Sequence, residues 1–119
     1  MKVEDIKFKA KSILDGAWVQ GDLVHKEDGA ICILRNGFNV SEVDPSTVCQ
    51  FTGLRDTNDV PIFEGDIINF GGEGEVVFKD GAFSVKFGKY TECLLSSLVK
   101  SKESIKVVGS KFDRKEGKE

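Results

Sequence analysis

The sequence predicts a mainly β fold with one short helix, and two observations carry this prediction. Short runs of β-branched and aromatic residues alternate with polar residues, as in residues 6–11 and 83–87. Turn-forming pairs such as Asp80-Gly81 separate these runs at short intervals. The 119 residues suffice for one domain or for two small lobes that share a core, and a change in composition near residue 50 favours two lobes.

Four strands are predicted in the first half of the chain, at residues 6–11, 18–25, 30–34 and 38–40. The first alternates apolar residues with lysines, and an Asp-Gly pair turns the chain after it. In the second, Gly21 and Asp22 are expected to form a bulge or kink. The third is apolar throughout, which predicts burial on both faces. Asp44 before Pro45 has the form of an N-cap and a first helical residue, so one helical turn is predicted there.

Four further strands are predicted in the second half, at residues 65–70, 75–78, 83–87 and 104–109. Asp80-Gly81 is the turn of the clearest hairpin. The glycines of residues 71–74 lead into β-branched residues and not into a helix. They therefore predict a hairpin tip, because a phosphate-binding loop should open a helix.

The helix is predicted over residues 90–100. Leu94, Leu95 and Leu98 fall at helical spacing in this segment. The last residues, 113–119, are mostly charged, and we expect them to form a disordered tail.

The charge of the chain gives no overall attraction to nucleic acid, since the formal net charge is −3 and the isoelectric point is about 5.3. Lys7, Lys9 and Lys11 would nevertheless lie on one side of the first strand. A solvated face or a lysine-protected sheet edge is the favoured interpretation of this pattern. A nucleic-acid-binding stripe is the alternative.

Cys32, Cys49 and Cys93 are odd in number and far apart in the sequence. The first residues carry charge from the second position on and lack the apolar region of a secretory signal. No apolar run has the length needed to cross a bilayer. We therefore expect a cytoplasmic protein with mostly buried thiols and no contact with a membrane.

No residue pattern predicts a catalytic centre, a metal site or a cofactor. His25 is the single histidine, and neither a nucleophile motif nor a paired-cysteine zinc pattern accompanies it. Glu64 and Asp66 flank Gly65 and would share one face of an extended chain, where paired carboxylates can perform acid–base chemistry. In a turn such side chains more often accept backbone N–H bonds, which is the favoured interpretation. Trp18, the only tryptophan, is expected in the core or, alternatively, on a half-exposed recognition surface.

The segment VDPSTVCQFTGLRDTNDVPIFEGDII, residues 43–68, closely resembles the signature of the YopX family of phage and prophage proteins. Other segments resemble the family in the same order: IKFKAK, GAWVQGDLVH, GEVVFKDGAF and IKVVGSKFD. The family pattern has Asn-Gly where this chain has Asn58-Asp59, with Pro61 close behind. This departure predicts either a different turn type or a position at a sheet edge.

The resemblance implies a finer architecture and an origin. Residues 1–49 would form an N-terminal β lobe packed on an SH3-like β-barrel of residues 50–112, followed by the tail at 113–119. A phage or prophage origin and a location in the host cytoplasm follow from the family in the same way. The family offers no established catalytic residue to carry over to this chain.

We expect a non-enzymatic phage or prophage accessory protein, a binding or regulatory module for a host or phage protein. The binding residues suggested by the sequence are Trp18, Arg55, Asp56, Glu64 and Asp66. Nucleic-acid binding through the lysine strand is the alternative, since small β-barrels also bind oligonucleotides. Hydrolysis by the two carboxylates beside Gly65 and a structural role in virions are further hypotheses, and the sequence does not determine the oligomeric state.

Overall fold

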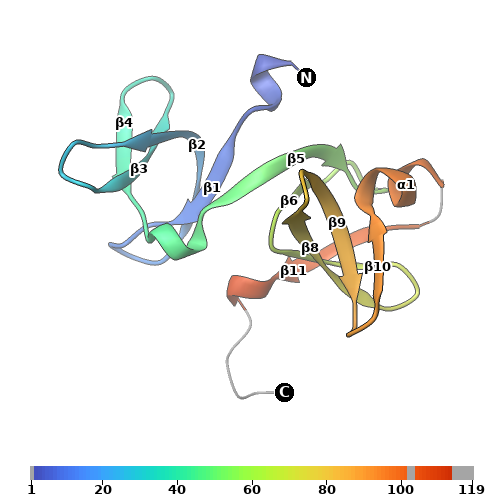
Figure 1. Ribbon diagram of the computed structural model, residues 1–119. Coiled ribbons are helices and arrows are strands. Elements are labelled where there is room, and N and C mark those ends of the chain that lie inside the picture. The colour runs from blue at the N-terminus through green and yellow to red at the C-terminus, as the bar shows by residue number, and fades with distance from the viewer. Residues whose placement is uncertain (1, 102–103, 114–119) are drawn as a thin grey trace. The chain divides into compact units, whose positions relative to one another are not determined.

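The computed structural model describes residues 2–101 and 104–113 (Figure 1). These residues form eleven β-strands, one short α-helix and three turns of 3-10 helix. The strands are β1 (Phe8–Lys11), β2 (Trp18–His25), β3 (Ile31–Arg35), β4 (Asn39–Glu42), β5 (Cys49–Arg55), β6 (Pro61–Phe63), β7 (Asp66–Asn69), β8 (Glu73–Lys79), β9 (Ala82–Phe87), β10 (Thr91–Leu94) and β11 (Lys106–Ser110). The helices are η1 (Val3–Asp5), η2 (Pro45–Thr47), α1 (Leu95–Lys100) and η3 (Lys111–Asp113). The predicted mainly β fold with one short helix is confirmed.

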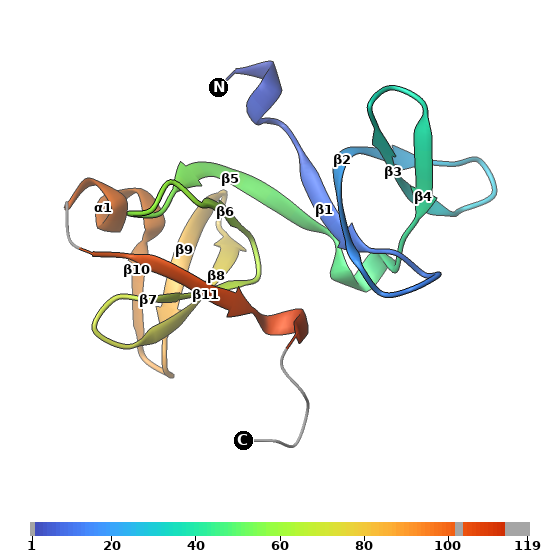
Figure 2. The same cartoon turned by 180° about the vertical axis from the view of Figure 1, so that it is seen from behind.

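The strands pair into two antiparallel sheets. Their strand orders are β4-β3-β2-β1-β5-β6 and β10-β9-β8-β7-β11. Figure 2 shows the second sheet from behind, where the last strand, β11, lies beside β7. Within the described part of the chain neither sheet is closed by hydrogen bonds. The SH3-like barrel that the family resemblance implies therefore stays a prediction.

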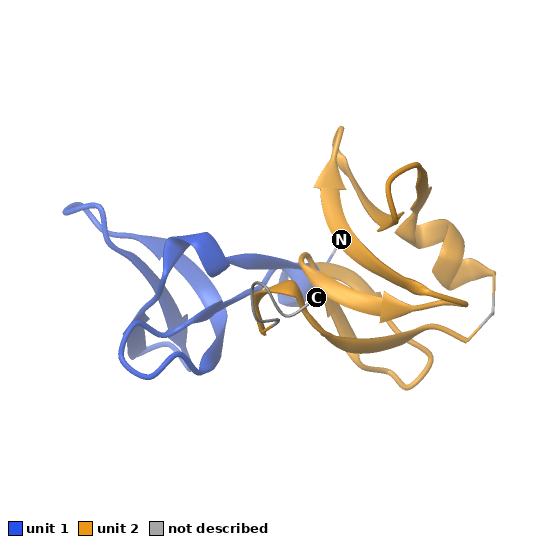
Figure 3. Ribbon diagram, turned by 90° about the horizontal axis from the view of Figure 1, so that it is seen from below, with its two compact units in different colours: residues 1–51 blue, residues 52–119 orange. Residues whose placement is uncertain are grey.

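The chain divides into two compact units, residues 1–51 and 52–119 (Figure 3). The sequence predicts the boundary slightly earlier, between residues 49 and 50. The difference arises inside β5, which belongs to both units: Cys49 at its start pairs with Lys9 of β1, and β6 follows β5 in the sheet order. Of the predicted tail, Asp113 ends η3, and the other residues lie outside the described ranges.

Apolar side chains of the first strands build the core of the first unit. Its buried members are Ala10, Ile33 and Val43, and the half-buried apolar residues around them are Phe8, Val19, Leu23, Ile31 and Val48. Successive residues of a strand point to opposite faces, so Phe8 and Ala10 in the core leave the neighbouring lysines on the other face. β1 lies between β2 and β5. The interpretation of these lysines as protection of a sheet edge is therefore wrong.

β2 continues through Gly21 and Asp22, where the sequence predicts a bulge or kink. The strand changes partner at this point: Gly21 pairs with Phe8 of β1, and Asp22 pairs with Leu34 of β3. A Cβ atom at Gly21 would lie 2.2 Å from the Leu34 carbonyl oxygen. Glycine is required here because two backbones approach closely.

The described residues of the second unit form one apolar core. Its buried members are Ile62, Ile68, Val76, Val85, Leu95, Leu98 and Ile105. The β8–β9 hairpin borders this core and turns at Asp80 and Gly81, whose φ angles are 53° and 82°. Two positive φ angles are the mark of a type I′ turn, so the predicted hairpin and its turn residues are confirmed.

The predicted helix over residues 90–100 is wrong in its first half. Thr91–Leu94 forms β10, which pairs along its whole length with β9, and α1 begins only at Leu95. Leu95 and Leu98 are buried and keep their helical spacing, whereas Leu94 is 48% exposed. Pairing with a neighbouring strand overrides the local helical preference of these residues.

The family-signature segment, residues 43–68, contains η2, β5, β6 and the first three residues of β7. A tight turn joins β5 to β6. Asp59 N donates to Asp56 O (3.0 Å), and Asp56 N donates to Val60 O (2.9 Å). Asp59 has a φ of 66°, but Asn58 does not have a positive φ, so the turn is not the type I′ turn of an Asn-Gly pair. β6 is also the terminal strand in its sheet order, where Pro61 is tolerated. The turn type therefore differs from that of an Asn-Gly pair, and the hairpin also lies at a sheet edge, so both alternatives predicted from Asn58-Asp59 and Pro61 are correct.

Replacing Asp59 with glycine should raise the free energy of unfolding by about 0.5 kcal/mol. Glycine adopts positive φ without a steric cost, and its greater freedom in the unfolded chain cancels only part of that gain. Urea denaturation of both proteins measures the difference. A loss of stability would instead mean that the Asp59 carboxylate, 4.0 Å from Arg55 Nε, contributes more than the backbone strain costs.

Candidate binding surfaces

The five residues suggested by the sequence as a binding site are divided between the two units. Trp18 belongs to the first unit. Arg55, Asp56, Glu64 and Asp66 belong to the second unit. Each unit therefore has its own candidate surface.

Asp56 is a structural residue of the β5–β6 turn. Its side chain is buried, and Oδ1 accepts hydrogen bonds from Asn58 N (2.8 Å) and Val60 N (2.9 Å). Oδ2 accepts a third bond from Val107 N of β11, also at 2.9 Å. A carboxylate that satisfies three backbone donors holds the turn and β11 together, and it does not face a ligand.

The Asp66 side chain also binds the backbone. It is 2% exposed, and its Oδ2 accepts a hydrogen bond from Phe63 N at 2.8 Å. Gly65 has a φ of 87°, so the chain between Glu64 and Asp66 is not extended. The extended geometry behind the acid–base hypothesis for Glu64 and Asp66 is therefore wrong. Glu64 is half-buried between β6 and β7.

Arg55 contacts the same turn from outside. Its Nη1 donates to Asp59 O (3.2 Å), and its Nε lies 4.0 Å from Asp59 Oδ1. The Asp59 side chain is 87% exposed. An ion pair in such a position contributes at most about 1 kcal/mol, and the hydrogen bond to Asp59 O is a second contact of Arg55 with this turn.

Trp18 lies with two lysines on one face of the first unit. Lys11 pairs with Trp18 across β1 and β2, and Lys9 pairs with Gln20. The Lys9 and Lys11 ammonium nitrogens lie 4.6 Å and 5.4 Å from the centre of the Trp18 ring. Cation–π contacts at exposed sites are worth about 0.5–1 kcal/mol each. Trp18 is half-buried and is not among the core residues of its unit, which corresponds to the alternative of a half-exposed surface.

Lys7 extends this surface toward β5. Its ammonium nitrogen lies 4.7 Å from the centre of the Phe51 ring, and its carbonyl oxygen accepts a hydrogen bond from Phe51 N (2.9 Å). We call the surface of Lys7, Lys9, Lys11 and Trp18 the basic face. It offers cations and an aromatic ring side by side, a combination suited to anionic ligands with planar groups.

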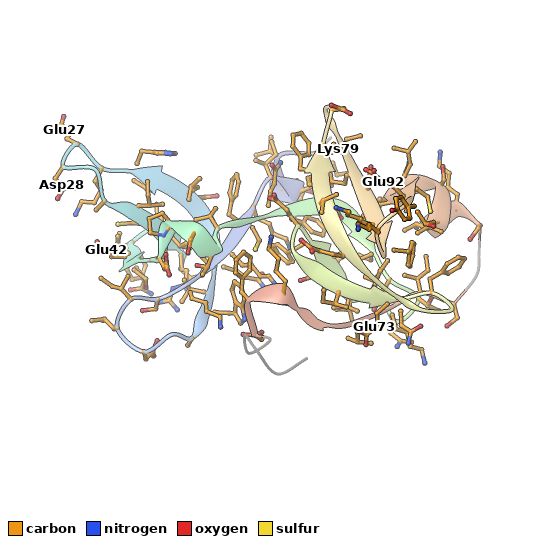
Figure 4. All side chains as sticks on the ribbon, turned by 60° about the horizontal axis from the view of Figure 1, so that its bottom comes forward. Glu27, Asp28, Glu42, Glu73, Lys79 and Glu92 are labelled. Atoms are coloured by element: carbon orange, nitrogen blue, oxygen red, sulfur yellow. The ribbon has the colours of Figure 1, made fainter. Side chains whose placement is uncertain are left out.

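The second unit presents an open sheet edge at β10. In residues 2–101 and 104–113 no strand pairs with the outer side of β10, the first strand in its sheet order. Tyr90, directly before β10, is 89% exposed. Within the sheet, Glu92 of β10 contacts Lys79 of β8, with 3.2 Å between Oε1 and Nζ (Figure 4). Sequence reasoning missed this edge because it assigned the segment to a helix, and only the pairing with β9 identifies the strand.

Further residues that could serve catalysis or metal binding are His25 and the three cysteines. Among the residues that the structure describes, no group of three or more His, Cys, Asp or Glu side chains could hold a metal ion. His25 is exposed at the end of β2. Cys32 and Cys49 are buried and Cys93 is half-buried, in agreement with the prediction for the thiols. No helix in the described ranges is long and apolar enough to cross a membrane.

Comparison with known proteins identifies one family. The family model described as YopX protein matches residues 7–116, which is nearly the whole chain. No curated protein and no solved structure matches the chain. The resemblance inferred from the signature segment is confirmed at the level of the family.

Proposed function

From the premise that this chain belongs to the YopX family, we propose that it is a non-enzymatic accessory protein of a phage or prophage. It binds a host or phage protein in the cytoplasm of the bacterial host. The observation that carries the proposal is the open edge of β10, with exposed Tyr90 and Leu94 at its two ends. An extended peptide that adds to such an edge gains main-chain hydrogen bonds, and its alternate side chains give specificity.

The proposal that the protein is not an enzyme rests on the structural roles of the carboxylates in the family-signature segment. Asp56 and Asp66 both accept backbone N–H bonds, so removing either would damage the fold before it affected any reaction. Glu64 can be changed more safely because it is only half-buried. A broad hydrolysis screen that compares the protein with its Glu64→Gln variant tests this part of the proposal, and turnover lost in the variant would contradict it.

For residues 50–112 we include the SH3-like barrel in the proposal. Ile62 of β6 packs in the same core as Ile68, Val76 and Val85 of the five-stranded sheet. A hairpin that covers one face of a curved sheet is a common way for a small β domain to enclose its core. In such a domain β10 is an accessible edge for a partner.

Affinity capture from nuclease-treated host lysate tests the proposed edge, with Leu94→Lys as the test variant. A lysine on an edge strand opposes the addition of another strand. We expect Leu94→Lys to reduce recovery of a specific protein partner about tenfold, as for an interface residue of moderate importance. The matched control is Val40→Lys, because Val40 is 56% exposed on another strand, β4, and this variant should recover the partner like the unmodified protein.

The two variants also define the result that contradicts the proposal. Equal recovery of the partner by Leu94→Lys and Val40→Lys would exclude β10 as the docking edge. Cross-linking with mass spectrometry adds an independent readout, since a partner on this edge should cross-link to Lys86 or Lys89, which are exposed residues of β9 and of the turn after it. Circular dichroism establishes that each variant is folded before capture.

A further inference from the structure

The basic face of the first unit carries its positive charge in a regular row. Lys9 and Lys11 lie on β1, and Lys7 directly precedes the strand. Alternate residues of a strand are about 6.7 Å apart, so the row extends over about 13 Å. Three lysines at alternate positions of one segment can face the repeated charges of a linear polyanion.

A shallow hollow of about 340 Å³ lies beside this row. Its lining residues all belong to the first unit and are Lys7, Gln20, Gly21, Asp22, Leu34, Arg35 and Asn36. Gln20 pairs with Lys9, so the hollow and the row share one surface. The hollow thus offers two cations and two side-chain amides, which can bind phosphate oxygens and the polar edges of planar bases.

The hollow and the row of lysines contain more cations than carboxylates, although residues 1–51 as a whole contain eight Asp and Glu residues and six Lys and Arg residues. The lining includes one acidic side chain, Asp22, against the cations of the hollow and the row. Asp15 accepts a hydrogen bond from Ala17 N, and Asp44 accepts two from Ser46. Glu27 and Asp28 lie at the turn between β2 and β3 (Figure 4). Glu4 and Asp5 belong to η1, just before Lys7, and Glu42 belongs to β4. The excess of positive charge is therefore limited to the hollow and the row of lysines.

We propose that the basic face binds single-stranded nucleic acid, with phosphates on the lysines and Arg35 and a base stacked on Trp18. Aromatic stacking together with a cationic surface is the general way in which proteins bind single strands without reading their sequence. The cation–π contacts of the Lys9 and Lys11 ammonium groups with the Trp18 ring are weaker than charge-assisted hydrogen bonds, so hydrogen bonds to phosphates can replace these contacts when a base stacks on the ring.

The position of β1 favours a nucleic acid over an acidic peptide. β1 pairs with β2 on one side and with β5 on the other. A peptide therefore cannot add to it as a strand, and a ligand must bind through side chains alone. Duplex nucleic acid is disfavoured as well, because its bases are stacked within the helix and cannot reach Trp18.

The first test is fluorescence titration of the full chain with an oligothymidylate of about 15 nucleotides, a length that spans one site. Trp18 is the only tryptophan, so quenching of tryptophan emission reports stacking at this position alone. The salt dependence is measured between about 50 and 200 mM. With four phosphate contacts, the logarithm of the association constant should fall with a slope of about −3 against the logarithm of salt concentration.

Substitutions separate the role of the cations from that of the ring. Lys9→Ala and Lys11→Ala should each make the salt slope less steep by about 0.7. Lys26→Ala is the matched control, because Lys26 is an exposed lysine in the turn after β2 of the same unit, and it should leave the slope unchanged. Trp18→Ala, followed by anisotropy of a labelled oligonucleotide, should weaken binding about tenfold or more with little change in slope. Trp18→Phe covers the case in which the alanine variant does not fold.

The proposal is wrong if the oligonucleotide does not bind at about 50 mM salt. It is also wrong if binding neither quenches tryptophan emission nor changes its salt slope in Lys9→Ala and Lys11→Ala, or if a duplex binds more tightly than the single strand. Polyglutamate is the competitor that distinguishes an acidic peptide. It should neither quench Trp18 nor displace the oligonucleotide efficiently, and if it does both, the ligand is a peptide. This inference is independent of the protein partner at β10, so Leu94→Lys should bind the oligonucleotide like the unmodified chain.

Discussion

An alanine in place of Asp56 is expected to lower the free energy of unfolding by about 4 kcal/mol. The substitution leaves three backbone N–H groups, those of Asn58, Val60 and Val107, without their acceptor. Each hydrogen bond to a charged group contributes about 1.5–3 kcal/mol, and entering water replaces part of this loss. Thermal denaturation followed by far-ultraviolet circular dichroism should show a melting temperature lower by about 15 °C or more.

Two further variants make this result specific to the hydrogen bonds. Asp56→Asn keeps one acceptor oxygen but presents an amide N–H₂ to one of the donors, so it should lose about 2 kcal/mol. Glu92→Ala removes a carboxylate that forms a surface ion pair with Lys79, and it should change stability by less than about 1 kcal/mol. If Asp56→Ala costs no more than Glu92→Ala, the carboxylate does not hold β11 to the turn.

Gly21→Ala is expected to destabilise the first unit by about 3 kcal/mol. The added Cβ would lie 2.2 Å from Leu34 O and 3.0 Å from Leu34 C. Both are backbone atoms, which cannot move aside as easily as the end of a flexible side chain. Either β2 and β3 separate locally or the strand rotates, and both lose ladder hydrogen bonds and packing around Ile33.

The emission of Trp18 reports this unfolding, because Trp18 lies in the same unit as Gly21. The midpoint of the urea transition followed by tryptophan emission should shift to lower concentration. Gly72→Ala is the control: a Cβ at Gly72 meets no heavy atom within 4 Å. A similar small effect of both substitutions would mean that β2 and β3 adjust to the extra methyl group at little cost.

Features set by adjacent residues could be predicted from the sequence. The Asp80-Gly81 turn depends only on residues that tolerate positive φ, and both have it. The helical turn at η2 depends on an acceptor before proline, and Asp44 Oδ1 accepts from Ser46 N at 3.0 Å as an N-cap. Such motifs contain their own hydrogen-bond partners, so no distant contact can change them.

Features set by distant pairing could not be predicted. Residues 91–94 have leucines at helical spacing nearby, yet they form a strand because β9 supplies the partner. The lysine pattern correctly placed the lysines on the face of β1 that points away from the core, but it could not show that β5 pairs with that strand. The signature segment, with its many turn residues, contains β5, β6 and the start of β7 for the same reason.

The residues of the candidate surfaces also divide into those that a local pattern predicts and those that only distant pairing places. The three lysines could be placed on one face of their strand from its alternation. Trp18 of β2 joins them only through the register of β1 and β2, in which it pairs with Lys11. Arg35 joins them only through the register of β2 and β3, which no local pattern reveals. The structural role of Asp56 was equally hidden, because Val107, one of its donors, is 51 positions away in the sequence.

The bond between Asp56 and Val107 has a consequence for synthesis on the ribosome. Thr57 N also donates to Ile105 O, so the first turn of the second unit is completed by its last strand. As the chain emerges, residues 1–51 contain all the members of their own core and can fold early. The second unit must wait for Ile105 and Val107, with its apolar strands exposed in the interval. A nascent chain halted before these residues would have a folded first unit and an unfolded second unit that chaperones and proteases can bind.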